Sequence, residues 1–218
     1  MPEAPRNTPA RAGAFEPAPD QEPEGLLMGD SGPVAAAYQD GRLDYRFVDQ
    51  DSTLAKVYAG LVAAFPGQAL SFEGRSRDDR LFLVRVYGDR NPGEYFLFDT
   101  QTGRARFLLA QRSWIKPGAM AAMQPVSFKA RDGLEIPSYY FLPRDHKPGQ
   151  RLPTVLHIHG GPTVRADRWG EFTYGVREAQ ILASRGYAVV VPNFRGTPGL
   201  GSKVYYSGFG AVGRQMQE

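Results

Sequence analysis

The sequence predicts a mixed fold, in which antiparallel β-structure over the first half of the chain is followed by an α/β region. Two observations carry this expectation. Short alternating apolar segments separated by turn residues fill residues 34–109, which is typical of antiparallel hairpins. After residue 125 two continuous apolar runs flank one helical pattern, and runs without alternation are typical of strands in a parallel sheet. We therefore place a boundary near residue 125.

The composition is that of an ordinary globular protein. The chain has 218 residues, which is enough for one or two domains with a buried core. Its 26 basic and 23 acidic residues give a net charge of +3, and no run of five or more like charges marks a nucleic-acid or membrane-binding patch. Since there is no cysteine, disulfides and thiolate metal ligands are excluded. We expect neither nucleic acid nor a membrane as a partner.

The start of the chain differs from the rest. It holds six of the 18 prolines and almost no large apolar side chains, so we expect residues 1–24 to be disordered. A proline-rich strap lying on the fold is the alternative. The segment lacks the apolar stretch of a signal peptide, which makes the cytoplasm the default compartment. A periplasmic protein stays open if the true N-terminus lies elsewhere, so the compartment is unknown.

Residues 25–125 carry the pattern of antiparallel strands joined by tight turns. The segment VAAAYQDGRLDYRFVD alternates around Asp40-Gly41, a strong hairpin signal. Further strands are expected in RLFLVRVYGD, EYFLFD and ARFLLA. An amphipathic helix is expected before these strands, capped by Asp51 or Ser52 and ending at Pro66-Gly67. Its apolar face is made of Leu54, Val57, Tyr58, Leu61 and Val62. Evenly spaced hairpins fit the blades of a β-propeller, but they also fit a sandwich or a meander.

Residues 126–218 begin with one more hairpin, in VSFKARDGLEIPSYYFLP, and then change character. Continuous apolar runs at 154–159 and 187–193 predict two strands, buried on both faces, that lie as parallel neighbours or near neighbours. The helix between them is expected to end at Gly186, with an apolar stripe made of Phe172, Val176, Ala179 and Leu182. This order of elements indicates the opening of an α/β domain.

The first of these strands runs into the turn His159-Gly160-Gly161-Pro162. In open α/β sheets the reactive groups gather at the carboxyl ends of the strands. Glycines at such a place let backbone N–H groups approach a substrate without a Cβ atom in the way, as an oxyanion hole requires. A loop of this type forms half of the oxyanion hole in α/β-hydrolases. Taken alone, the turn also fits a plain tight turn without function.

Three segments around the turn resemble, in this order and spacing, the start of the catalytic domain in the prolyl oligopeptidase family of serine peptidases. They are ARDGLEIPSYYFLP, LPTVLHIHGGP and LASRGYAVVVPNFRG. The family includes acylaminoacyl peptidases and dipeptidyl peptidases. The preceding SRDDRLFLVRVYGDRNPGEYFLFDTQTGRARFLL resembles the last propeller blades before that domain. The resemblance implies that residues 25–125 are partial β-propeller-like blades and that residues 126–218 are the truncated N-terminal part of an α/β-hydrolase domain.

The resemblance also implies a mechanism and an oxyanion donor. A serine on a G-x-S-x-G turn attacks the peptide carbonyl, a histidine takes its proton, and an aspartate orients the histidine. In the acylaminoacyl-peptidase branch the second glycine of the turn, matched here by Gly161, gives its backbone N–H to the oxyanion. The other branches use a tyrosine hydroxyl from the position matched by His159. The histidine favours the first branch, with His159 in the loop but not the direct donor, and no cofactor or metal is implied.

No complete triad can be assembled from this chain. In YYSGFG, Ser207 lies between Tyr205 and Phe209, which are too large for the sharp turn around a nucleophile, and GDSG at 29–32 fails on spacing. All three histidines precede the place expected for the nucleophile. We therefore expect the triad to lie beyond residue 218 and the chain to be inactive as given, with peptide substrates bound only by the intact protein. Open sheet edges should make the chain self-associate.

The sequence also contains weaker patterns for a metal site and for a phosphate-binding loop. A metal site formed by His146, His157 and His159 lacks a carboxylate or cysteine at ligand spacing, and a hydrogen-bonded core histidine is the commoner role for His157. In GTPGLGSK, Ser202 precedes Lys203, the reverse of a phosphate-binding loop. The main rival is a non-catalytic, propeller-type binding module or a truncated, inactive gene product.

Overall fold

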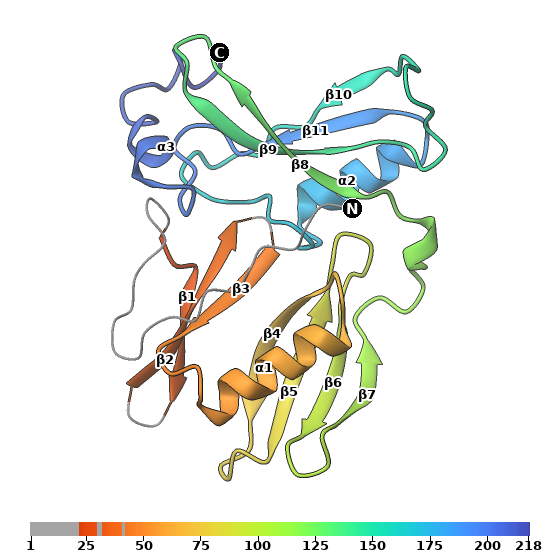
Figure 1. Cartoon of the computed structure of the whole chain (residues 1–218). Helices are drawn as coiled ribbons and strands as arrows, with labels where there is room; N and C mark the ends of the chain where they lie inside the picture. The colour runs from red at the N-terminus through yellow and green to blue at the C-terminus, as the bar shows by residue number, and fades with distance from the viewer. Residues whose placement is uncertain (1–21, 30–31, 41) are drawn as a thin grey trace.

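The computed structural model describes residues 22–29, 32–40 and 42–218, and it contains three β-sheets (Figure 1). Most of the segment predicted to be disordered therefore lies outside the described residues. Its last residue, Glu24, is described, and its backbone N–H donates to Ala37 O at 2.8 Å. The described part of the chain thus includes the end of this segment, where Glu24 is hydrogen-bonded to β2.

The first sheet is an antiparallel meander of three strands in chain order. Asp40 pairs with Arg42, so the hairpin predicted around this turn is confirmed. The central strand is buried on both faces because its run of alanines leaves room for close neighbours on either side. The strands are β1 (Gly25–Gly29), β2 (Gly32–Asp40) and β3 (Arg42–Phe47).

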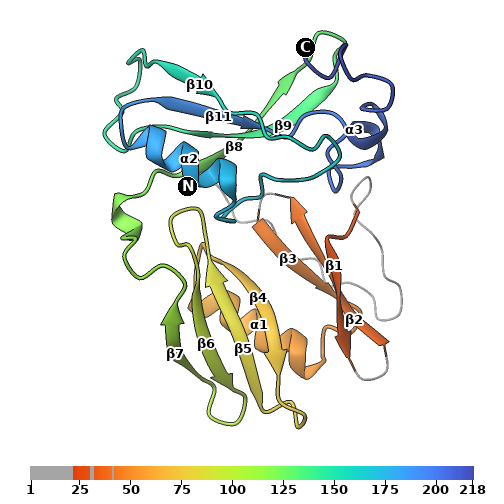
Figure 2. The same cartoon turned by 180° about the vertical axis from the view of Figure 1, so that it is seen from behind.

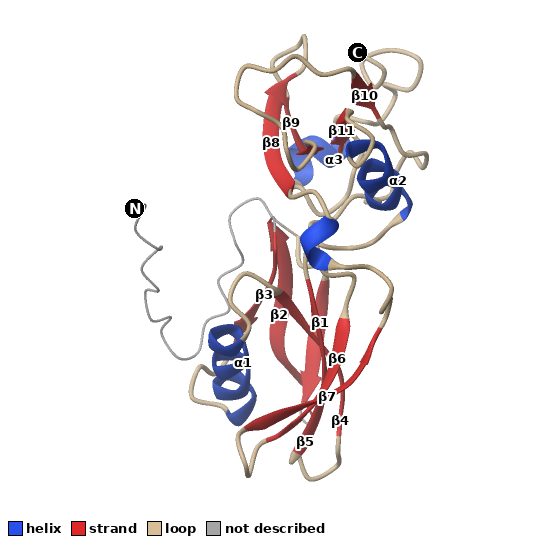
Figure 3. Ribbon diagram, turned by 90° about the vertical axis from the view of Figure 1, so that its right-hand side faces the viewer, coloured by secondary structure: helices blue, strands red, loops and turns tan. Residues whose placement is uncertain are grey.

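The helix α1 (Thr53–Ala64) forms where the apolar spacing predicted it. The Ser52 hydroxyl accepts a hydrogen bond from Ala55 N at 3.2 Å and so caps the first turn. Its buried side chains share one apolar cluster with residues of the first and second sheets. Val62 is 44% exposed, so its assignment to the buried face was wrong; it lies at the margin of the stripe. Figure 3 shows the helix along one side of this β-structure.

The second sheet is a four-stranded antiparallel meander, again in chain order. The antiparallel pairing predicted for this region is confirmed. The last strand is an edge, and Phe107 and Leu109 on it are 52% and 53% exposed. The strands are β4 (Ala69–Arg75), β5 (Leu81–Tyr87), β6 (Glu94–Asp99) and β7 (Arg104–Ala110), and a 3-10 turn, η1 (Pro117–Ala119), follows.

The third sheet has the strand order β10-β11-β9-β8. The parallel pairing predicted for its last two strands is confirmed, with Thr154 opposite Ala188. The sheet is mixed, because β9 runs antiparallel to both of its neighbours. It begins at Met123, so the change of sheet falls slightly before the predicted boundary at residue 125. The strands are β8 (Met123–Lys129), β9 (Glu135–Phe141), β10 (Thr154–Leu156) and β11 (Ala188–Pro192).

Two expectations for this region were wrong. The strand predicted over 154–159 ends at Leu156, and it is an edge strand with Leu156 57% exposed, not a strand buried on both faces. The connecting helix α2 (Tyr174–Ala183) begins after Phe172, which is buried but precedes the helix and so is not part of its stripe. A further short helix, α3 (Ser202–Tyr206), follows β11. No helix in the described part of the chain is long and apolar enough to cross a membrane.

The third sheet and α2 lie across one end of the other two sheets (Figures 1 and 2). Trp169 is buried where they meet, and its indole N–H donates to Met123 O at 3.2 Å. The Gln180 amide bonds to both the N–H and the carbonyl of Ala121, each at 2.8 Å. Trp169 therefore fixes the segment between β10 and α2 to β8, and Gln180 fixes α2 to the segment that precedes β8.

Candidate functional site

Two loops lie side by side beyond the carboxyl ends of β10 and β11. We call residues 157–170 the glycine loop and residues 193–201 the partner loop. The ring of His159 in the glycine loop packs on Phe194 of the partner loop, with centroids 4.6 Å apart. Further along, a Cβ atom placed on Gly196 would lie 3.6 Å from Pro162 O. This is the edge of an α/β sheet at which ligands bind.

The backbone of Gly161 turns tightly over Val164. A Cβ atom at position 161 would lie 2.7 Å from Val164 Cγ2, whereas one at Gly160 would meet nothing within 4 Å. The turn therefore excludes a side chain at Gly161 but not at Gly160. Both glycines are exposed, and among the described residues nothing accepts the Gly161 N–H. That N–H is free for an outside acceptor.

His159 braces the same turn from inside. Its ring is 9% exposed, and Nδ1 lies 2.7 Å from Gly160 O. A carbonyl oxygen only accepts, so Nδ1 is the donor in this contact. Carbonyl and N–H point in opposite directions across a trans peptide unit, so fixing Gly160 O also fixes the direction of the Gly161 N–H. The two sequence-predicted residues thus act on one peptide unit.

A buried carboxyl group, Asp167, belongs to the glycine loop and was not found from the sequence. Its side chain is fully buried, and a Cβ atom on Gly175 would lie 2.5 Å from Oδ1. Burial raises the pKa of Asp167, while the nearby His159 and His157 act in the opposite direction. Within the described part of the chain neither carboxyl oxygen has a hydrogen-bond partner. Nothing in the sequence pattern distinguishes this aspartate from an exposed one.

The other candidates are engaged elsewhere. The Ser207 hydroxyl donates to Val204 O at 2.7 Å, at the end of α3, so it is a helix-terminal hydroxyl without a base. His157 Nε2 lies 2.5 Å from Glu178 Oε2, the hydrogen-bonded role weighed for it. Across residues 22–29, 32–40 and 42–218 no three His, Cys, Asp or Glu side chains are placed to hold a metal ion.

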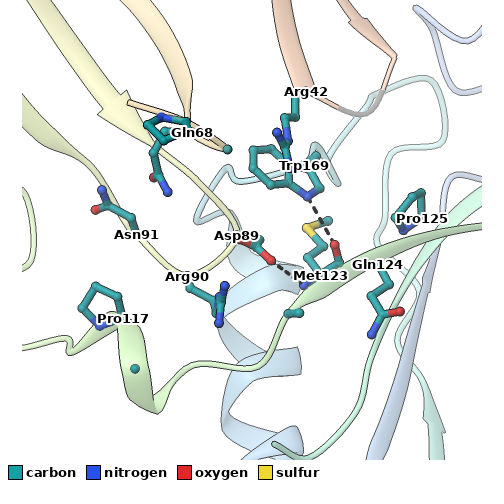
Figure 4. Close-up of a pocket in the computed structure, with 14 residues that line it drawn as sticks. Arg42, Gln68, Asp89, Arg90, Asn91, Pro117, Met123, Gln124, Pro125 and Trp169 are labelled. Carbon is teal, nitrogen blue, oxygen red and sulfur yellow. Dashed lines mark hydrogen bonds between the residues drawn. The ribbon is translucent and has the colours of Figure 1, made fainter. Parts of the chain in front are cut away.

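A cavity of about 760 Å³ lies where the three sheets meet, within the size range of ligand sites. Figure 4 shows the Arg42 guanidinium beside Trp169, 4.7 Å above the ring centroid. Asp89 Oδ2 accepts the Met123 N–H at 3.1 Å, and Arg90 also lines the cavity. Neither His159 nor Gly161 contributes to its walls, so the cavity and the glycine loop are separate features.

Known proteins of similar sequence are peptidases. The chain is 33% identical over 164 residues to dipeptidyl aminopeptidase BIII of Pseudoxanthomonas mexicana, covering 72% of this chain and 23% of that protein. It is 26% identical over 128 residues to dipeptidyl-peptidase 5 of Porphyromonas gingivalis, covering 56% of this chain and 18% of the relative. The chain therefore spans less than a quarter of the length of either protein. No family model matches it.

Solved structures of similar fold are peptidases as well. An acylaminoacyl peptidase in complex with Z-Gly-Gly-Phe-chloromethyl ketone matches with a TM-score of 0.56 and 20% identity, over 90% of this chain and 29% of the other. The acylaminoacyl peptidase of Pyrococcus horikoshii matches with a TM-score of 0.53 and 22% identity, over 85% and 27%. At these identities the match shows a shared fold.

Proposed function

We propose that this chain, which belongs to the prolyl oligopeptidase family of serine peptidases, carries the oxyanion-stabilising loop of an enzyme that hydrolyses short peptides or acylated amino-acid derivatives. The proposed donor is the backbone N–H of Gly161. Relatives named as dipeptidyl peptidases support peptide hydrolysis at the level of the family. The acylaminoacyl peptidase solved with a peptide chloromethyl ketone supports a peptide as the substrate class.

One observation carries the proposal most: His159 Nδ1 lies 2.7 Å from Gly160 O. This contact holds the carbonyl of the Gly160–Gly161 peptide unit inward, and the N–H of the same unit is then directed away from the ring. An oxyanion hole depends on such donors being in place before charge develops, because they then need no reorganisation in the transition state. In this proposal His159 orients the donor and does not itself touch the substrate.

In the proposed reaction a serine hydroxyl attacks the carbonyl carbon of the substrate while a histidine takes the hydroxyl proton. An aspartate orients that histidine. The carbonyl electron pair moves to oxygen, and the resulting oxyanion accepts a hydrogen bond from Gly161 N–H. The intermediate then collapses with cleavage of the C–N bond, and the histidine gives the proton to the leaving amine. Water, deprotonated by the same histidine, attacks the acyl-serine ester in an equivalent second step, which releases the acid and restores the serine hydroxyl. We propose that nucleophile, acid and base all lie beyond residue 218, after the glycine loop in chain order.

The domain division follows from the same proposal. The four-stranded antiparallel meander β4–β7 has the architecture of one propeller blade, which supports assigning residues 25–125 to propeller-like blades. The mixed sheet with α2 between its parallel strands supports assigning residues 126–218 to the start of an α/β-hydrolase domain.

A binding module without catalysis is the second candidate. The cavity of about 760 Å³ near Arg42 and Trp169 favours it, since this hollow is separate from the glycine loop and needs no nucleophile. Such a module would bind a ligand without turning it over. The experiment that tests the peptidase proposal also separates these two candidates.

A fluorophosphonate probe, which labels activated serines, tests the proposal. We expect the 218-residue chain to stay unlabelled and a longer protein, extended through about 150 further residues to include a G-x-S-x-G turn, to be labelled at that serine. Labelling of the short chain at Ser207 would show that the role assigned to this hydroxyl is wrong. A folded longer protein that stays unlabelled would contradict the peptidase proposal and leave the binding module.

A further inference from the structure

Arg165 is a buried cation that joins three separate parts of the chain. Its side chain is 1% exposed, and both terminal nitrogens of the guanidinium find acceptors within the fold, while Nε has none among the described residues. Nη1 donates to Glu24 Oε1 at 2.6 Å and to Gly199 O at 3.1 Å, and Nη2 donates to Gln39 O at 2.6 Å. Glu24 precedes β1, Gln39 lies in β2, and Gly199 belongs to the partner loop. One side chain therefore ties the glycine loop to the first sheet and to the partner loop.

The partner loop closes directly over this ion pair. Gly199 has a φ of +74°, and a Cβ atom there would lie 3.0 Å from Glu24 Oε1 and 3.2 Å from Arg165 Nη1. A side chain at this position would be strained by the backbone and would also press on the pair. The absence of a side chain at Gly199 is thus what allows its carbonyl to reach the guanidinium.

A second set of contacts fixes the neighbouring residues to the same two anchors. Gln39 Nε2 donates to Trp169 O at 3.1 Å, and Arg168 Nη2 donates to Glu24 Oε2 at 2.9 Å. The Arg168 side chain is 34% exposed; its Nη1 donates to Arg165 O at 2.8 Å within the same loop, and among the described residues it reaches neither Gln39 nor Gly199. It shares the carboxylate of Glu24 but does not bridge the three elements, which makes it a matched control for Arg165.

Arg165 is linked to the proposed oxyanion donor, Gly161 N–H, through one neighbouring residue, Val164. Arg165 directly follows Val164, whose Cγ2 atom occupies the space that a Cβ of Gly161 would need. The position of Val164 therefore limits the backbone conformation of the turn at Gly161. Because Arg165 is anchored, the chain on the C-terminal side of Val164 is held in place. Figure 2 shows the ends of β1–β3 lying next to the chain between β10 and α2.

We propose that Arg165, paired with Glu24, is a positioning residue that holds the glycine loop and so pre-orients the Gly161 N–H; the part concerning the oxyanion rests on the proposed function. A planar guanidinium can serve three acceptors in fixed directions, which an ammonium group cannot. The carboxylate of Glu24 offsets the burial of this charge, so the two residues act as a pair. The segment before β1 thereby becomes part of the support of a loop about 140 residues later in the chain.

Amide hydrogen exchange on the 218-residue chain tests the anchoring itself. The amides of residues 158–166 donate no hydrogen bonds within the described part of the chain and so have no protection to lose, whereas the amides of Glu171, next to the glycine loop, and of Gly196 and Thr197, in the partner loop, are hydrogen-bonded. Arg165→Gln and Glu24→Gln should each raise exchange at these three amides by about tenfold or more, while Arg168→Gln should change it by less than about threefold. Peptides from β5 should keep their exchange rates, which checks that the variants fold. Glu24→Gln is the milder change, so it decides the matter if Arg165→Gln unfolds the chain. Unchanged exchange at Glu171, Gly196 and Thr197 in Glu24→Gln would overturn the proposal.

Kinetics of the longer protein test the consequence for the oxyanion. Glu24→Gln should lower kcat by about tenfold or more with KM within about threefold, because a misplaced donor weakens only the transition state. A raised KM with unchanged kcat would contradict the positioning role. If the parent longer protein shows no hydrolysis, the proposed function fails, and the exchange result still decides whether Arg165 and Glu24 anchor the loop.

Discussion

At the scale of single residues, the conformation of the glycine loop depends on glycines whose missing side chains leave room for neighbouring groups. Gly161 leaves the space taken by Val164, and Gly175 leaves the space taken by the Asp167 carboxyl group. The position of Gly161 after a strand made it predictable from the sequence. Asp167 and the Arg165–Glu24 pair were not, because they are recognised by burial and by a contact between residues 141 positions apart.

The raised pKa of Asp167 predicts a dependence of stability on pH. Burial disfavours the charged form, so the folded chain holds the proton to a higher pH than the unfolded chain does. The contribution of this group to stability is complete below the unfolded pKa and is lost as the pH rises through the folded pKa. Asp167→Asn removes the charge, so we expect it to raise the melting temperature at pH 7 by a few degrees, roughly.

The rise in melting temperature of Asp167→Asn should disappear near about pH 3, where the carboxyl group of Asp167 is protonated in both the folded and the unfolded chain. Thermal melts followed by circular dichroism at several pH values measure it. The exposed Asp145→Asn is the control and should leave the melting temperature unchanged at every pH. A variant Asp167→Asn that is less stable than the parent at pH 7 would show that the buried carboxylate is charged and well paired.

At the scale of elements, α1 and the hairpins were predictable because local signals fix them. The Asp40-Gly41 turn and the Ser52 cap act within a few residues of the sequence. The strands β1 and β4 were missed, since GLLMG and ALSFEGR are short and interrupted by glycine. The exposure of β10 could not be read from its apolar run, because an edge position depends on which strand pairs beside it.

The cap of α1 gives a prediction at this scale. Ser52→Ala removes the side-chain oxygen that accepts the Ala55 N–H, so we expect a loss of about 1 kcal/mol in the free energy of unfolding. Urea denaturation followed by circular dichroism measures it. Val62→Ala, on the exposed side of the same helix, should change the free energy by less than about 0.5 kcal/mol. Equal effects at the two sites would contradict the capping role.

At the scale of the whole molecule, the described sheets present apolar edges. Four apolar side chains at these edges are each more than half exposed: Phe107 and Leu109 on β7, Leu156 on β10, and Ile158 just after β10. Unpaired strand edges of this kind invite association with other chains. We expect sedimentation velocity of the 218-residue chain to show association that grows with concentration. Leu109→Lys should reduce it, and a parent chain that stays monomeric with a sharp melt would contradict the expectation.

The account as a whole claims that the loop after β10 provides a backbone donor to an oxyanion. The most direct measurement is the steady-state kinetics of Gly161→Pro and His159→Phe in the longer protein with a short peptide substrate. Proline has no N–H, so Gly161→Pro should lower kcat by about 10²–10³-fold with little change in KM. Gly161→Ala introduces the same Cβ contact with Val164 but keeps the N–H, so it is the matched control and should lose less kcat than Gly161→Pro. His159→Phe removes only the brace on Gly160 O and should cost less. Equal losses at both positions would contradict the account, because the oxyanion contact would then belong to the side chain of His159.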